Sequence, residues 1–307
     1  MPWISRGLRG GILTSRYPAQ ADGYGERWAG TIRLRHAGGG EARDSTGLAV
    51  ACPTQAIAVT GDGLELDRGR CVVCGRCVTL RPDLVELDNA TEVGSLARGD
   101  LVVSTGEQGD EDACAPLGAP GAAPGSLPGD DLARLRASLE LRTRALRRSV
   151  HVRHVDAGSD GSEEWEIAAL TNPVYDVQRL GIFFTASPKH ADVLLVTGAA
   201  TAGMIGPLRQ TYEAMPSPKV VIAAGTDAVS GGLLAGGYAT DGGIGSILPV
   251  DVWIPGSPPS PFSLLHGILL AVCLLPAAPG RNRSHDTRPA LVPHQPGDPS
   301  ATQGSPS

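Results

Sequence analysis

Four cysteines are spaced as the ligands of an iron–sulfur cluster would be. Three of them form a C-x2-C-x2-C run, which holds three corners of a [4Fe–4S] cluster in many bacterial proteins. In proteins with two such clusters, the fourth cysteine of a run ligates the other cluster and precedes a proline. The missing ligand should therefore be a distant Cys-Pro pair, and one lies upstream of the run. The predicted ligands of one [4Fe–4S] cluster are Cys52, Cys71, Cys74 and Cys77.

The same spacing tests for a second cluster. Its ligands would lie just before Cys52 and just after Cys77. All four of these positions carry other residues, although the last of them still precedes Pro82. Loss of one complete set beside retention of the other predicts a protein with a single cluster. The four substituted positions are Ala42, Ser45, Leu48 and Arg81.

A zinc site or a structural knuckle is the alternative for these cysteines. A lone C-x2-C pair would favour zinc, but the longer run with its Cys-Pro partner favours a cluster. A disulfide framework is not expected, because we find no secretion signal and disulfides are rare in reducing compartments. Two further cysteines are expected to be inert, since Cys114 lies in a linker and Cys273 on an apolar helix.

Residues 149–276 have the pattern of an α/β domain. Four short runs rich in Val, Ile and Leu each end in glycine, and helix-like stretches at 202–215 and 261–275 follow the second and fourth runs. Apolar strands that alternate with helices predict a parallel sheet covered on both faces. Ligands bind outside the carboxyl ends of such strands. The loops where chemistry is expected begin at Gly158, Gly198, Gly225 and Gly256.

Composition and charge exclude other classes. The chain has 307 residues, which indicates about two domains. Its net charge of −6 argues against a nucleic-acid binder. We expect neither a membrane-spanning helix nor a signal peptide, which favours a cytoplasmic protein. Two low-complexity segments, a linker and a tail, contain nine of the 41 glycines and ten of the 25 prolines.

The predicted organisation has six parts. An extended arm is followed by a cysteine-bearing domain, a disordered linker, a basic amphipathic helix, the α/β domain and a disordered tail. Their bounds are 1–40, 41–105, 106–131, 132–148, 149–276 and 277–307. The apolar face of the basic helix is expected to carry Leu132, Leu135, Leu139 and Leu146.

The α/β region also carries a family resemblance. The residues concerned are WEIAALTNPVYDVQRLGI at 165–182, ASPKHADVLLVTG at 186–198, YEAMPSPKVVIAAG at 212–225 and VDVWIPGSPP at 250–259. They resemble the small subunit of membrane-bound [NiFe] hydrogenases and formate hydrogenlyase, which is homologous to the B (20 kDa-type) subunit of NADH-quinone oxidoreductase. The resemblance implies a flavodoxin-like parallel sheet with flanking helices.

The N-terminal part resembles a second subunit of the same complexes. The motif Thr14-Ser-Arg-Tyr-Pro18 and the cysteine unit are similar to their two-cluster ferredoxin-like subunit. The chain therefore looks like a fusion of two neighbouring electron-transfer subunits. In this interpretation a small α+β ferredoxin-like unit precedes the α/β domain.

The hydrogenase family holds its terminal [4Fe–4S] cluster with four cysteines that are absent here, although the flanking motifs survive. The residues in their place could form an oxygen-rich site for Mg²⁺, Mn²⁺ or Ca²⁺. The interpretation we favour is that they fill a pocket that has lost its cluster ligands, with at least one raised carboxyl pKa. The degenerate positions are Asp160, Glu163, Asp227 and Ser257.

The resemblance implies a non-catalytic electron-transfer subunit with one [4Fe–4S] cluster. Catalysis would belong to a large subunit of the hydrogenase or complex-I type, with membrane-arm subunits and a quinone nearby. The chain would lie on the cytoplasmic face of the inner membrane and associate with it through these partners. One alternative is a structural subunit that bridges the large subunit to the membrane arm. The other is an enzyme that uses a metal or nucleotide at Asp160, Glu163 and Asp227.

Overall fold

The larger part of the fold is a five-stranded parallel sheet. The computed structural model describes residues 5, 7, 11–19, 28, 30–35, 46–61, 63–105, 129–144 and 149–275. Read from the β7 edge, the strand order β7-β6-β8-β9-β10 is 2-1-3-4-5 in chain order, which is the flavodoxin-like order. The predicted α/β fold is confirmed. The strands are β6 (Val150–Asp156), β7 (Ile182–Phe184), β8 (Val193–Thr197), β9 (Val220–Ala224) and β10 (Val252–Ile254).

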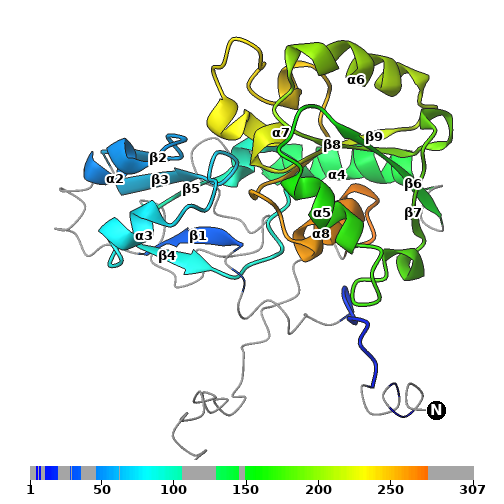
Figure 1. Cartoon of the computed structure of the whole chain (residues 1–307), viewed down its shortest axis with the longest axis horizontal. Helices are drawn as coiled ribbons and strands as arrows, with labels where there is room; N and C mark the ends of the chain where they lie inside the picture. The colour runs from blue at the N-terminus through cyan, green and yellow to red at the C-terminus, as the bar shows by residue number, and fades with distance from the viewer. Residues whose placement is uncertain are drawn as a thin grey trace, which may run out of the picture.

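Helices cover both faces of this sheet, as Figure 1 shows with α6 on one side and α5 and α8 on the other. Every residue of β8 and β9 is buried, which explains why these strands are apolar without alternation. The helices of this part are α4 (Gly129–Thr143), α5 (Ser162–Ala169), α6 (Ala202–Ala214), α7 (Thr226–Ser230) and α8 (Pro261–Ala271). Single turns of 3-10 helix are η4 (Val177–Leu180), η5 (Pro188–His190), η6 (Gly232–Leu234) and η7 (Ile244–Ser246).

Three details differ from the sequence-based expectations. Strand β7 was not expected, because three residues at a sheet edge are too short to show a pattern. Helix α8 ends at Ala271, before the predicted end at 275. Helix α4 ends at Thr143, and its Leu139 is buried whereas Leu135 is 41% exposed. The predicted apolar face of this helix is therefore wrong at Leu135.

The cysteine unit is a separate group of short strands and helices, at the left of Figure 1. Strands β1 and β4 pair antiparallel, and β2, β3 and β5 form an antiparallel sheet. Each helix of the unit is followed by a residue and a proline: Cys52-Pro53 after α2 and Arg81-Pro82 after α3. The elements are β1 (Thr31–Leu34), α2 (Thr46–Ala51), β2 (Ile57–Thr60), β3 (Gly63–Asp67), α3 (Arg76–Leu80), β4 (Val85–Asp88), η3 (Arg98–Leu101) and β5 (Val102–Ser104).

The cysteine unit packs against the parallel sheet. Leu101 is fully buried in the core formed by α6, α7 and one face of the sheet. The backbones of Ser95 and Trp253 exchange two hydrogen bonds of 2.9 and 2.8 Å. The N-terminal segment 11–19 also reaches the sheet domain, where the hydroxyl of Tyr17 lies 3.0 Å from Nδ1 of His266. Burial lowers the pKa of His266 to about 4, so the imidazole is neutral.

Some sequence-based expectations concern residues outside the described ranges. These are Ala42, Ser45, Cys114, Leu146, the side chain of Leu132, most of the expected linker and the tail. Among the helices that are described, none is both long and apolar enough to cross a membrane.

Candidate functional site

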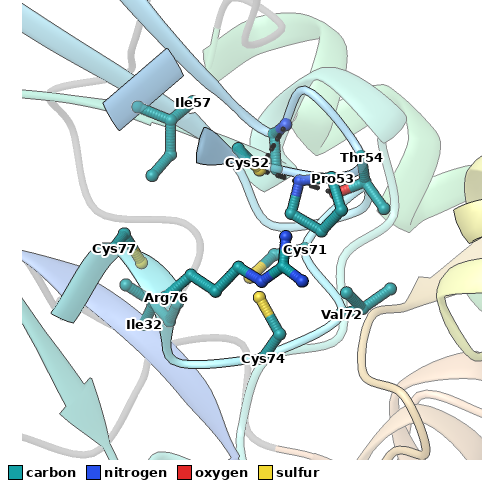
Figure 2. A pocket seen from close by; sticks show the side chains of 11 residues that line it. Ile32, Cys52, Pro53, Thr54, Ile57, Cys71, Val72, Cys74, Arg76 and Cys77 are labelled. Carbon is teal, nitrogen blue, oxygen red and sulfur yellow. Dashed lines mark hydrogen bonds between the residues drawn. The ribbon is translucent and has the colours of Figure 1, made fainter. Parts of the chain in front are cut away.

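The four cysteines of the predicted ligand set line one pocket. Cys52 follows α2, Cys71 and Cys74 lie on the loop between β3 and α3, and Cys77 is on α3. Figure 2 shows their sulfur atoms facing a common space, although Cys52 is far from the others in sequence. The structure therefore brings together the residues that the spacing singled out.

The loop between β3 and α3 is bent tightly around this space. Val73 and Gly75 both have positive φ angles, 50° and 74°. Glycine adopts such angles freely, but a β-branched residue such as valine does so only under strain. Strained backbone is concentrated at functional sites. Here the bend turns Cys71, Cys74 and Cys77 toward the same side.

Backbone amides point at two of the sulfur atoms. The amide of Ala56 donates to Sγ of Cys52 at 3.2 Å, and the amide of Val73 donates to Sγ of Cys71 at 3.4 Å. Such hydrogen bonds stabilise thiolates and help to set the potential of an iron–sulfur cluster. They are donors that a merely structural cysteine does not need.

Burial acts in the opposite direction on the thiols. It raises the pKa of Cys71 to about 12, and the neighbouring cysteines add to the increase. Burial also raises the pKa of Cys77. Without a bound cation these thiols stay protonated at neutral pH. A metal or cluster must displace their protons, so its binding here is coupled to proton release.

The donor set fits a four-iron cluster. Beside the four thiols the pocket is lined mainly by apolar groups such as Ile32, Ala56 and Ile57. Each thiolate of a [4Fe–4S] cluster binds a different iron, so the four sulfurs surround a space and do not meet at one point. Among the described residues, no three His, Cys, Asp or Glu side chains are grouped to hold one metal ion.

Two of the four positions at which a second cluster would need cysteines have other roles. Leu48 is 1% exposed and belongs to the hydrophobic core of the cysteine unit. Arg81 forms an ion pair with Asp83 at 2.6 Å. An apolar core residue and a paired arginine provide no thiolate at these two places.

The degenerate positions lie beyond the carboxyl ends of the parallel strands, with Asp160 and Ser257 on loops, Glu163 in the first turn of α5 and Asp227 in the first turn of α7. Asp160 and Glu163 follow β6, Asp227 follows β9 and Ser257 follows β10. Glu163 is 1% exposed, whereas the side chains of Asp160 and Ser257 are exposed. Hydrogen bonds of Ser162 place Asp160 beside Glu163, and Gly225, two residues before Asp227, lies against the Glu163 carboxylate. The described contacts do not include a polar partner for Ser257.

Tight backbone turns make room for the two more buried carboxylates. A Cβ atom on Gly225 would lie 2.5 Å from Oε1 of Glu163, and one on Gly232 would lie 1.9 Å from Oδ1 of Asp227. Ser162 connects Asp160 to Glu163, because its hydroxyl is 2.6 Å from Oδ1 of Asp160 and 3.1 Å from Oε2 of Glu163.

The three carboxyl groups have different pKa values because their environments differ. Burial raises the pKa of Glu163 to about 7, and the charges of Asp227 and Asp160 add to this. Burial and Asp160 raise the pKa of Asp227. Hydrogen bonds from Ser162 lower the pKa of Asp160. Near neutral pH the group therefore holds a titrating proton on Glu163.

Sequence reasoning missed a second polar network beside this group. Thr197, fully buried at the end of β8, donates to Oε1 of Glu164 at 2.6 Å. The other oxygen of Glu164 accepts from Ser159 at 2.8 Å, and Nε2 of His154 lies 3.0 Å from the Thr197 hydroxyl. These residues join β6, β8 and α5 at the switch point of the sheet. Only their position next to the degenerate motif could have drawn attention to them.

Comparisons with known proteins find one family model, which matches inside the sheet domain, and several relatives. The model of the family "NADH ubiquinone oxidoreductase, 20 Kd subunit" matches residues 161–271. Formate hydrogenlyase subunit 7 of Escherichia coli (strain K12) is 36% identical over 183 residues, which cover 60% of this chain and 69% of that protein. The probable membrane-bound hydrogenase subunit mbhJ of Pyrococcus furiosus is 42% identical over 125 residues, which cover 41% of this chain and 75% of that protein.

A solved structure is also similar. It is that of the membrane-bound sulfane sulfur reductase, an archaeal respiratory membrane complex. One of its chains is 30% identical, with a TM-score of 0.39, over 43% of this chain and 73% of that chain.

Proposed function

Because the chain belongs to the family of the NADH ubiquinone oxidoreductase 20 Kd subunit, we propose that it is an iron–sulfur electron-transfer subunit of a membrane-associated respiratory complex. The observation that carries the proposal is the pocket lined by Cys52, Cys71, Cys74 and Cys77. A [4Fe–4S] cluster bound there would accept and pass on single electrons.

The protein residues would hold and tune this cluster. The four thiolates would be its ligands, and the amides of Ala56 and Val73 would stabilise the charge on two of them. The apolar walls would limit access of water, which together with these hydrogen bonds sets the potential. The ferredoxin-like identity of this unit, and its fusion to the sheet domain, are parts of the proposal.

The proposal assigns one cluster to the chain. At the positions where the family carries the ligands of its terminal cluster, Asp160, Glu163, Asp227 and Ser257 offer oxygen atoms. Oxygen ligands are a poor match for iron–sulfur clusters, which prefer soft thiolates. The interpretation that these residues are polar fillers of the former ligand positions extends the proposal.

The partners follow from the relatives. Their names place them in formate hydrogenlyase and in a membrane-bound hydrogenase. We therefore propose a large subunit of hydrogenase or complex-I type and membrane-arm subunits as partners of this chain. The chain would associate through them with the cytoplasmic face of the inner membrane.

The carboxylates of Asp160, Glu163 and Asp227 favour a second candidate function, which is a structural role without electron transfer. No thiolate replaces the terminal cluster ligands, so an electron at the cysteine pocket has no onward site at Asp160, Glu163 or Asp227. A chain of this kind could instead bridge the large subunit to the membrane arm as a structural element. The two candidates differ in whether the cysteine pocket holds a redox-active cluster.

Anaerobic purification of the full chain tests the proposal. Iron and acid-labile sulfide are counted per chain, and EPR spectra are recorded after reduction. About four irons and one reduced-cluster signal are expected, with loss of both in Cys71→Ala and retention in Cys114→Ser, which lies outside the proposed ligand set. A single zinc ion would overturn the cluster assignment. A folded chain without metal would favour the structural candidate, and about eight irons would contradict the single cluster.

A further inference from the structure

One charged side chain lies in the cysteine pocket. Arg76 is the first residue of α3 and stands between Cys74 and Cys77 in the cysteine run. Figure 2 shows its side chain extending across the space that the sulfur atoms face, with the guanidinium group near Cys71 and Cys74. Of the described residues that line this pocket, Arg76 alone is a permanent ion.

Like Arg68 and Arg70, Arg76 has no ion pair among the described residues, whereas other arginines of the cysteine unit are paired. Arg81 pairs with Asp83 at 2.6 Å, Arg98 pairs with Asp67 at 2.7 Å and Arg33 pairs with Asp88 at 3.1 Å. Within the described part of the chain, no carboxylate forms an ion pair with Arg76. Its charge is therefore not balanced by a protein group there.

The missing counter-charge matches what the pocket would hold. Four thiolates give a [4Fe–4S] cluster a net negative charge, and reduction adds one more electron. The potential of such a cluster depends on nearby charge and on solvent exposure. A cation beside the cluster stabilises the reduced form more than the oxidised form, because the attraction grows with the charge.

We propose that Arg76 is the counter-charge of the cysteine pocket and sets a higher reduction potential for the cluster than four thiolates alone would give. The inference depends on the proposed function, because it requires a cluster on Cys52, Cys71, Cys74 and Cys77. Arg76 is not a ligand. It acts through the charge of its guanidinium group, whose planar fork can also donate hydrogen bonds to sulfur.

A potentiometric titration followed by EPR tests this role in the anaerobically purified full chain. Arg76→Gln removes the charge and Arg76→Lys keeps it. Arg209→Gln on α6 is the matched control, because it removes an equal charge from an exposed position outside the cysteine unit. Iron and sulfide are counted in every variant, so the measurement does not depend on activity.

The expected result is a lower midpoint potential in Arg76→Gln only. The equilibrium constant for reduction should fall roughly three- to tenfold relative to Arg209→Gln, where tenfold corresponds to about 59 mV for one electron. Arg76→Lys should stay closer to the unaltered chain. Added salt should reduce the difference between the unaltered chain and Arg76→Gln, because an exposed charge is screened.

The outcomes separate this inference from the proposed function. If the unaltered chain holds no iron, the proposed function fails. If it holds a cluster but Arg76→Gln and Arg209→Gln have equal potentials, only the role of Arg76 is overturned. Loss of iron in both Arg76 variants would also overturn it, since the side chain would then serve packing. Loss in Arg76→Gln with retention in Arg76→Lys would support it.

Discussion

The side-chain hydroxyl of Thr226 donates a hydrogen bond of 3.0 Å to the backbone carbonyl oxygen of Cys71. Thr226 is fully buried and directly precedes Asp227. One end of this bond therefore belongs to the proposed cluster pocket, and the other to the start of α7, next to Asp227, which we propose as a former ligand position. The two sites adjoin, although their residues are far apart in the sequence.

Replacing Thr226 by valine should weaken the contact between the two parts. The substitution keeps the shape of the side chain but leaves the carbonyl of Cys71 without this donor. The free energy of unfolding should fall by about 1 to 3 kcal/mol, as measured by urea denaturation. Thr211→Val, which removes a bond of 2.9 Å inside α6, is the control and should cost less. If both variants lose the same free energy of unfolding, the hydrogen bond between Thr226 and Cys71 stabilises the fold no more than a bond within one helix.

Adding a methyl group at Gly69 should disturb the same contact from the other side. Its Cβ would lie 2.7 Å from Cζ of Arg98 and 2.8 Å from Cγ1 of Val229 on α7. Arg98 is held by two hydrogen bonds to Asp67, so it cannot easily move away. Gly69→Ala should lose about 1 to 3 kcal/mol of stability.

The control for this overpacking is Gly47→Ala in α2. A Cβ there meets nothing within 4 Å, so the helix should gain about 1 kcal/mol or less from the better helix former. Thermal and urea unfolding of the two variants give the comparison. The packing argument is wrong if Gly69→Ala is as stable as the unaltered chain.

Glu163 should make stability depend on pH. Its pKa is about 7 in the folded chain and lower in the unfolded chain, so the folded chain binds more protons between about pH 4.5 and 7. The free energy of unfolding should therefore decrease as pH rises through this window, by about 2 to 3 kcal/mol from this group. Glu163→Gln, which imitates the neutral acid, should lack this decrease and be the more stable protein at pH 8.

Glu213→Gln on the exposed side of α6 is the control for the pH measurement. Urea denaturation from pH 5 to pH 8 gives the three curves. The curve of Glu213→Gln should run parallel to that of the unaltered chain, and the curve of Glu163→Gln should diverge from it above pH 5. Parallel curves for both variants would mean that Glu163 titrates normally.

Four cysteines placed at the degenerate positions should create a second cluster. The combined variant carries Asp160→Cys, Glu163→Cys, Asp227→Cys and Ser257→Cys. After anaerobic reconstitution it should hold about eight irons per chain, compared with about four in the unaltered chain. A variant that keeps Asp227 but has the other three changes should bind fewer. If the fourfold variant still binds about four irons, these residues do not occupy the family's ligand positions.

Much of the sheet domain could be predicted from local patterns. Strands β6, β8, β9 and β10 lie in the four predicted runs that end in glycine, and burial on both faces explains why β8 and β9 are apolar throughout. The rule that parallel strands end at one edge also predicts that Asp160, Glu163, Asp227 and Ser257 lie close together, and the described contacts link Asp160 to Glu163 through Ser162 but include no polar contact of Ser257. Strand β7 was missed because its three residues depend on pairing with β6 for their conformation.

The features that depend on long-range packing could not be predicted. Leu135 is exposed because another side of α4 faces the sheet domain. Arg142 of the same helix forms an ion pair with Asp251, which fixes the orientation of α4. The bond between Thr226 and Cys71 requires the docking of two parts. The side chain of Arg76 extends over the pocket, and the spacing of the cysteines does not predict the direction of this side chain.

The paired backbones of Ser95 and Trp253 join the cysteine unit to the sheet domain within a single polypeptide. The association of the cysteine unit with the sheet domain is intramolecular, because the connecting chain gives each a high effective concentration near the other. Dilution cannot separate them, and each copy made by the ribosome contains both in a one-to-one ratio. Any assembly that takes up this chain therefore receives the cysteine pocket and the sheet domain together, in a fixed stoichiometry.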